Sequence, residues 1–194
     1  MKTSKTKILF ILPSLKAGGA ERVISFVSQN LDKTKFECVL VVLGHQKDAI
    51  YEVDNIDVHF LNRPRLLKSL KPLFNTIKKQ KPDIVLGSIG HVNSMLTLFK
   101  VYFRNIIFVG REASLSGIIS KFIEPQGFKY YNLYRNYFKN LDHIICQSKE
   151  MAENLIDRFK VSEDKISVIN NPISSNLPLR TKPINSSETK DLIQ

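Results

Sequence analysis

The chain has 194 residues, of which 43% are hydrophobic, enough to bury the core of one α/β domain. Its formal net charge of +11 favours an anionic partner: nucleic acid, phospholipid headgroups or a phosphorylated substrate. No apolar stretch approaches the ~18 residues of a membrane-spanning helix, so we expect a soluble or peripheral protein. Cys38 and Cys146 each lie in an apolar run, which indicates buried, reduced thiols and a cytosolic compartment.

Short apolar runs recur along the chain and predict strands. Several are rich in Ile and Val and apolar on both faces, as is typical of strands covered by helices on each side. The first run follows lysines, as in a secretory signal, but Pro13 ends it after five apolar residues. The run is too short for a signal peptide and is typical of a first strand. The predicted strands span residues 7–12, 37–43, 58–61, 83–88, 106–110, 143–146 and 165–169.

Amphipathic patterns between these runs predict helices over residues 19–31, 66–79 and 94–103, and another after Ser148, which we expect to be its N-cap. The tyrosine-rich, basic residues 126–140 predict an extra helix. The β-α alternation predicts a Rossmann-like, doubly wound, mainly parallel sheet of about seven strands, whose ligands bind beyond the carboxyl ends of the strands. Residues 174–194 are polar and aperiodic, which predicts a linker or disordered tail after a domain of residues 1–173.

The first strand leads into Gly18 and Gly19, just before a helix. Adjacent glycines let backbone amides approach a ligand, and a helix N-terminus favours a phosphate, so this loop is either an anion site or only a flexible turn. The G-x-G-x-x-G fingerprint is absent, which argues against nicotinamide binding. No G-K-[ST] phosphate loop and no zinc-type Cys/His spacing occurs, and we expect neither a metal nor a cofactor.

Two further strands deliver polar residues to the same edge of the predicted sheet. The fourth is followed by His91 and Asn93, and we expect His91 to lie near Gly18 and Gly19. This histidine either hydrogen-bonds a sugar or phosphate or helps to cap the next helix. The fifth is followed by Arg111 and Glu112, which either bind a ligand or form an ordinary surface ion pair.

A basic patch lies between Arg63 and Pro82, where seven basic residues occur with no acidic one. It either attaches the protein reversibly to an anionic membrane, assisted by residues 126–140, or is simply the solvated face of a helix. The lysines that we expect to contact the membrane are Lys68, Lys71, Lys78 and Lys79. No recognised nucleic-acid-binding module accompanies the charge, so nucleic-acid binding is disfavoured.

Taken in order, these motifs resemble the N-terminal domain of family 4 (group 1) glycosyltransferases of the GT-B fold. The first part of the match is Gly18-Gly19-Ala20-Glu21-Arg22 after the first strand. The others are His91 with Asn93-Ser94, Arg111-Glu112, and a closing series that begins at Leu141 and includes Asn170-Asn171-Pro172. The match covers about residues 5–175.

The resemblance implies a retaining, metal-independent transfer of a hexose from a nucleotide sugar, often to a lipid-linked or surface-polysaccharide acceptor. It implies that Gly18 and Gly19 contact the donor diphosphate or the acceptor and that His91 contacts the transferred sugar. Asn93, Arg111 and Glu112 then belong to the substrate-binding region. The family's E-x7-E motif, which lies in a second, donor-binding domain, is absent from these residues.

We therefore expect an acceptor-binding half that is inactive without a donor domain. Its expected partners are a nucleotide-sugar donor, held only when that domain is present, and a lipid-linked or glycan acceptor. The expected location is cytoplasmic, peripheral on the inner face of the membrane. The alternative is a non-enzymatic module that binds an anionic lipid or polymer.

Overall fold

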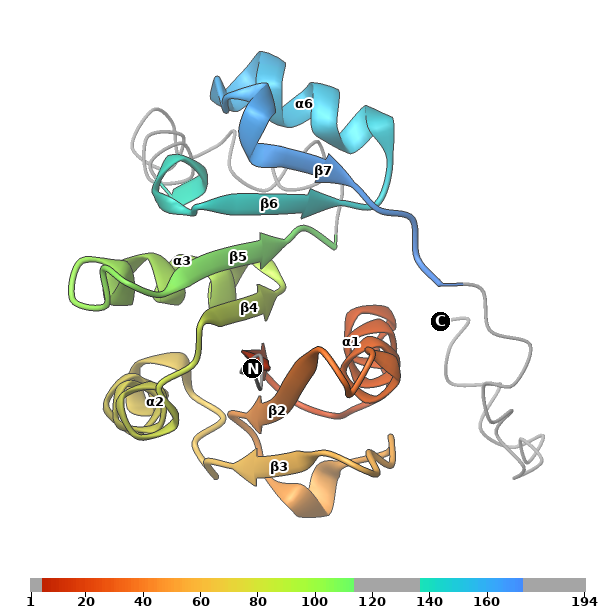
Figure 1. The fold of residues 1–194 in the computed structure, drawn as a ribbon, viewed down its shortest axis with the longest axis vertical. Helices are drawn as coiled ribbons and strands as arrows, with labels where there is room; N and C mark the ends of the chain where they lie inside the picture. The colour runs from red at the N-terminus through yellow and green to blue at the C-terminus, as the bar shows by residue number, and fades with distance from the viewer. Residues whose placement is uncertain (1–4, 114–136, 173–194) are drawn as a thin grey trace, which may run out of the picture.

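The computed structural model describes residues 5–113 and 137–172 (Figure 1). These residues form a seven-stranded sheet in the order β3-β2-β1-β4-β5-β6-β7, in which every pairing is parallel. The Rossmann-like parallel sheet predicted from the sequence is confirmed. The strands are β1 (Thr6–Leu12), β2 (Phe36–Val42), β3 (Asp57–Phe60), β4 (Ile84–Ser88), β5 (Ile107–Arg111), β6 (His143–Cys146) and β7 (Ile166–Val168).

Four long helices and two short 3₁₀ turns connect the strands within the described residues. The helices are α1 (Gly19–Asn30), α2 (Leu66–Gln80), α3 (Gly90–Lys100) and α6 (Lys149–Phe159), and the turns are η1 (Gln46–Asp48) and η3 (Glu163–Lys165). In Figure 1, α1 lies on the side of the sheet opposite α2 and α3. No helix in the described ranges has the length and apolar composition needed to cross a membrane.

The strand period of two builds the core on both faces of the sheet. In β1, Leu9 and Ile11 join one buried cluster, to which α2, α3 and α6 contribute. The alternate residues Ile8, Phe10 and Leu12 join a second cluster, to which α1 contributes Ile24. A central strand that is apolar on both faces thus requires helices on both sides, which explains why the sequence pattern identified the fold class.

The strand order reverses at β1, which pairs with β2 on one side and with β4 on the other. In a doubly wound sheet this reversal leaves a crevice at the carboxyl ends of the two strands, since their following helices depart to opposite faces. The loops that leave β1 and β4 therefore carry the residues in the best position to meet a ligand.

Some element boundaries differ from those predicted. Helix α3 begins at Gly90, four residues before the predicted start at 94, so His91 lies in its first turn rather than in a loop. Strand β5 extends to Arg111, so this arginine belongs to the sheet and does not follow it.

Other expectations can be compared only in part. Ser148 is the N-cap of α6, since its hydroxyl accepts the Met151 N–H at 3.3 Å. Cys146 is buried but Cys38 is only half-buried, and both are free thiols. Of the predicted helix 126–140, residues 137–140 are helical and the rest lies outside the described residues, as does all of the predicted tail.

Candidate functional site

The loop from β1 to α1 forms one side of the crevice. Gly18 is the N-cap of α1 in an extended conformation, and its carbonyl accepts a hydrogen bond from the Tyr51 hydroxyl at 3.3 Å. The Ile50 N–H donates to the Leu15 carbonyl at 2.8 Å, which fixes the loop further. At Gly19 a Cβ atom would meet nothing within 4 Å, so its backbone faces open space at the helix N-terminus. A ligand can approach these amides closely.

The buried carboxylate of Glu21 folds back over Gly18, where a Cβ atom would collide with it. The Ser14 hydroxyl donates to Glu21 Oε1 at 3.4 Å. A negative charge in the first turn is stabilised by the helix dipole, so Glu21 already satisfies part of the electropositive N-terminus. Gly19 therefore presents the more accessible backbone of the glycine pair.

His91 lies on the other side of the crevice, in the first turn of α3 after β4. The residue is exposed, yet partial enclosure lowers the pKa of its imidazole, and the negative charge of Glu21 opposes this shift. His91 is consequently neutral at pH 7, with one ring nitrogen able to donate and the other able to accept. The electrostatic influence of Glu21 also shows that His91 lies near the start of α1, as the sequence predicted.

Behind this crevice, polar side chains are buried between β4, β5 and the helical residues 137–140. Asn93, fully buried in α3, donates from Nδ2 to the Arg111 carbonyl at 3.1 Å and to the Tyr137 hydroxyl at 3.3 Å. The Tyr137 hydroxyl also lies 3.5 Å from Glu112 Oε2, and Glu112 is 1% exposed. Asn93 therefore connects α3 to β5 and to Tyr137.

Arg111 connects the sheet to the segment after β7. It is 5% exposed and donates from Nη1 to the Ser88 hydroxyl at 3.1 Å and from Nη2 to Asn171 Oδ1 at 2.6 Å. Asn171 in turn donates to Gln147 Oε1 at 2.8 Å. Burial lowers the pKa of the Arg111 guanidinium, whereas the Glu112 carboxylate raises it.

The alternative of a surface ion pair at Arg111 and Glu112 is wrong, because both side chains are buried. Ligand contact by Asn93, Arg111 or Glu112 stays a prediction. The structure brings Gly18, Gly19 and His91 to the crevice. The other three residues form the polar layer behind it.

Ser88, Tyr137 and Gln147 carried no predicted functional role, although Gln147 and the Asn170-Asn171-Pro172 run both belong to the closing series of the resemblance. Tyr137 had a signal, because it lies in the tyrosine-rich segment that predicted an extra helix. The remaining histidines bond neutral side chains, His45 to Asn62, His59 to Gln80 and His143 to Ser167, consistent with structural roles.

The four predicted membrane lysines are all exposed on α2. Their spacing places them on one face, opposite the buried Leu73 and Ile77. Among the residues that the structure describes, no cluster of three His, Cys, Asp or Glu side chains has the geometry of a metal site.

Comparison with known proteins identifies this arrangement. The sequence profile of Glycosyltransferase Family 4 matches residues 17–177, a range that contains both sides of the crevice and the polar layer behind it. The chain belongs to this family. Its fold and match are those of the N-terminal domain of a GT-B glycosyltransferase. No curated protein matches the family 4 chain.

Solved structures share the fold at low sequence identity. The lipopolysaccharide outer core galactosyltransferase WaaB in its apo form is 21% identical, with a TM-score of 0.67 over 92% of this chain and 50% of that chain. Anabaena HepE in complex with UDP is 16% identical, with a TM-score of 0.62 over 87% of this chain and 44% of that one.

A putative UDP-N-acetylglucosamine 2-epimerase from Listeria monocytogenes has the same fold, at 17% identity and a TM-score of 0.66, covering 87% and 45% of the two chains. The family 4 chain thus spans about half the length of each of these structures. Because one fold serves transferases and epimerases, the reaction must be argued from the family and the site.

Proposed function

We propose that this chain is the N-terminal, acceptor-binding half of a retaining hexosyltransferase that uses a nucleotide sugar. The observation that carries the proposal is the placement of Gly19 and His91 in the first turns of the helices that follow the adjacent parallel strands β1 and β4, with the Glu21 carboxylate acting on the His91 imidazole. Family membership supports transfer rather than epimerisation. The acceptor that we propose is a lipid-linked or surface-polysaccharide precursor, consistent with the name of WaaB.

Each side of the crevice has a distinct role in this proposal. The amides of Gly18 and Gly19 contact the donor diphosphate or the acceptor, since helix N-termini stabilise phosphate charge. His91 donates a hydrogen bond to the transferred hexose, which a neutral imidazole does without repelling a cationic transition state. Asn93, Arg111 and Glu112 shape the acceptor side of the crevice through their buried hydrogen bonds.

The described half supplies one wall of the active site, and we propose that a donor-binding half supplies the other. The E-x7-E motif that the family places in the donor domain does not occur in these 194 residues. HepE was solved with UDP in a chain about twice as long, which supports a nucleotide donor for the whole fold. The donor half then belongs to the rest of the polypeptide or to another chain.

The test is turnover in the presence of a donor half. We expect transfer from a uridine or guanosine diphosphate sugar when a compatible donor domain is added or fused, and none from the 194-residue chain alone. His91→Ala should reduce turnover at least about a hundredfold, the usual scale for a lost transition-state contact. Full activity of His91→Ala would remove the histidine from the proposal.

A second candidate is a non-enzymatic module that binds an anionic lipid or polymer. It is favoured by the exposed lysine face of α2, beside which Leu67 is 81% exposed. In both candidates we propose peripheral attachment to the cytoplasmic face of a membrane, because cationic and apolar side chains together suit such a surface. Turnover with a donor half distinguishes the two.

A further inference from the structure

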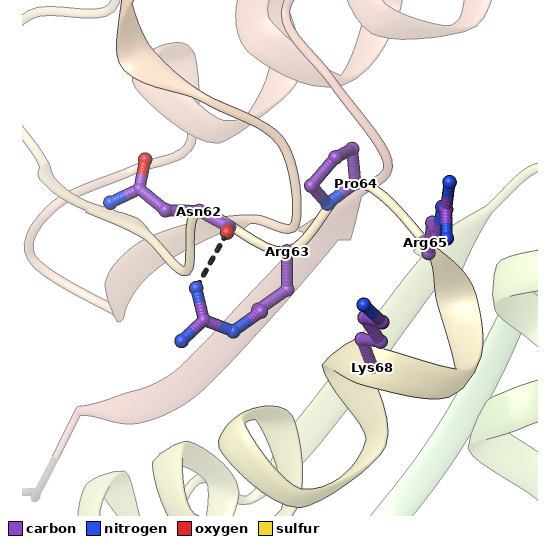
Figure 2. A pocket seen from close by; sticks show the side chains of 5 residues that line it. All are labelled: Asn62, Arg63, Pro64, Arg65 and Lys68. Atoms are coloured by element: carbon purple, nitrogen blue, oxygen red, sulfur yellow. Dashed lines mark hydrogen bonds between the residues drawn. The ribbon is translucent and has the colours of Figure 1, made fainter.

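A cavity of about 430 Å³ opens where β3 leads into α2 (Figure 2). Three of its five lining residues are cationic and none is acidic; they are Asn62, Arg63, Pro64, Arg65 and Lys68. Within residues 5–113 and 137–172, no carboxylate forms an ion pair with any of these three cations. Three uncompensated positive charges around one cavity favour an anion as its occupant.

The loop that forms the cavity is held in place by the neighbouring strand end. The Arg63 N–H donates to the Leu43 carbonyl at 2.6 Å and the Asn62 N–H donates to the Gly44 carbonyl at 3.3 Å. Asn62 has φ of 54° and its Oδ1 lies 3.2 Å from His45 Nδ1. The left-handed backbone of Asn62 is thus held by hydrogen bonds on both sides. Because the loop is already ordered, it loses little conformational entropy when a ligand binds.

Two further features favour an anion in the cavity: the position of the Arg63 side chain and the adjoining helix N-terminus. The Arg63 guanidinium donates from Nη1 to the Asn62 carbonyl at 2.9 Å, as Figure 2 shows, so it is held beside the loop while its other donors stay available. The cavity also adjoins the N-terminus of α2, whose first turn contains no acidic residue to offset the helix dipole. At the equivalent place in α1 the carboxylate of Glu21 provides that offset.

The cavity lies at the same edge of the sheet as the crevice. β3 is two strands away from β1 and three from β4, and strands are spaced about 4.8 Å apart, so the cavity lies roughly 10 Å from the β1 loop and roughly 14 Å from the β4 loop across the sheet. That separation suits an extended ligand with a diphosphate at one end and a sugar ring at the other. A nucleotide bound only at the crevice would not contact the three cationic side chains that line the cavity after β3.

We propose that this cavity binds a phosphate or diphosphate group carried by the acceptor. The inference rests on the proposed function and deepens it, since it assigns the acceptor to the class of phosphate esters. The anion contacts Arg63, Arg65 and Lys68, and the sugar attached to it extends toward His91. A lipid-borne diphosphate and a soluble sugar phosphate share this chemistry.

The test uses the 194-residue chain and two kinds of probe. Calorimetry with inorganic pyrophosphate measures binding of a free phosphate anion. Co-sedimentation compares phosphatidylcholine vesicles containing phosphatidic acid with vesicles of equal surface charge containing phosphatidylglycerol, so that a terminal phosphate is distinguished from charge alone. The cavity variant is Arg63→Gln/Arg65→Gln, and the matched control is Lys33→Gln/Arg104→Gln, which loses the same charge at two exposed positions before β2 and β5, at the opposite edge of the sheet.

We expect the cavity variant to bind pyrophosphate at least about tenfold more weakly, since tenfold corresponds to ~1.4 kcal/mol, less than one charge-assisted hydrogen bond contributes. The control should change about twofold or less. A second result would also support the cavity: wild type prefers phosphatidic acid vesicles but does not bind pyrophosphate, and the cavity variant loses that preference. This result would identify a lipid-borne phosphate as the ligand. Equal effects of the two variants, or no binding of either probe, would overturn the proposal.

This experiment involves neither a donor half nor turnover. Its failure would leave the proposed transferase function intact, and failure of the turnover test would leave the anion site intact.

Discussion

Removing the guanidinium of Arg111 should destabilise the fold through the segment that follows β7. Arg111→Ala leaves the fully buried Ser88 hydroxyl without its donor, and it also removes the hydrogen bond to Oδ1 of the exposed Asn171, where water can replace the guanidinium. Each hydrogen bond from a charged group contributes about 1.5–3 kcal/mol, and part of this is offset because the variant no longer buries a cation. We expect a net loss of about 2–4 kcal/mol, or roughly 4–16 °C in Tm for a domain of this size.

Urea unfolding of wild type, Arg111→Ala, Asn171→Ala and the double variant measures the energy of this connection. The two side chains are in direct contact, so we expect a coupling energy of about 1–2 kcal/mol. Arg104→Ala is the matched control, because this exposed arginine has the same charge and should change stability by about 0.5 kcal/mol or less.

A different result would change the role of Arg111. If Arg111→Ala were as stable as Arg104→Ala but turnover with a donor half were lost, the guanidinium would act on a ligand. The argument that it fastens the segment at Asn171 would then be refuted.

The other expected outcomes concern α6, the lysine face and the donor. Ser148→Ala should lower the free energy of unfolding by about 1 kcal/mol, because it removes the N-cap acceptor of Met151 N–H; unchanged stability in urea would mean that this cap is not formed in solution. Replacing Lys68, Lys71, Lys78 and Lys79 with Glu should abolish co-sedimentation with anionic vesicles at low salt, since each lysine contributes ~1 kcal/mol near such a surface. Equal binding by wild type and variant would exclude the lysine face. The 194-residue chain should bind nucleotide sugars no tighter than about millimolar in calorimetry, because a few contacts barely offset the cost of association. Micromolar affinity would contradict the need for a donor half.

The sequence predicted those features that follow from the hydrophobic pattern of a single strand or helix. Residues such as Leu9 and Phe10 in β1 are apolar on both faces, which requires a covered parallel strand. Because parallel strands end at a common edge, the same pattern was enough to predict that Gly19 and His91 lie near one another. The hydrophobic pattern does not indicate a reaction, and the expectation of sugar transfer came from the family motifs.

Contacts between distant segments could not be predicted in this way. Arg111 and Asn171 are 60 residues apart, and nothing in the local sequence around Arg111 indicates that its charge is buried. The start of α3 was also missed, because Ile89 adopts φ of 81°, a conformation that a β-branched residue rarely takes without tertiary support. The basic cavity at Arg63 appeared in the sequence only as part of a charge run.

The geometry of the crevice can be tested through the titration of His91. Burial lowers the pKa of its imidazole, and the carboxylate of Glu21 opposes this shift by favouring the charged ring. Glu21→Gln removes the negative charge while keeping an acceptor for the Ser14 hydroxyl. We therefore expect the pKa of His91, followed by NMR of its ring protons, to fall further in this variant.

The sign of this shift is decisive, because only a nearby carboxylate holds the pKa up. The variant His91 should stay neutral to lower pH, and any loss of stability caused by protonating His91 in the unfolded chain should become steeper as the pH falls below about 6.5. Glu163→Gln, which removes an exposed carboxylate outside the crevice, is the matched control variant. An unchanged or raised pKa at His91 would place it away from the α1 N-terminus, and both walls of the proposed crevice would then have to be reassigned.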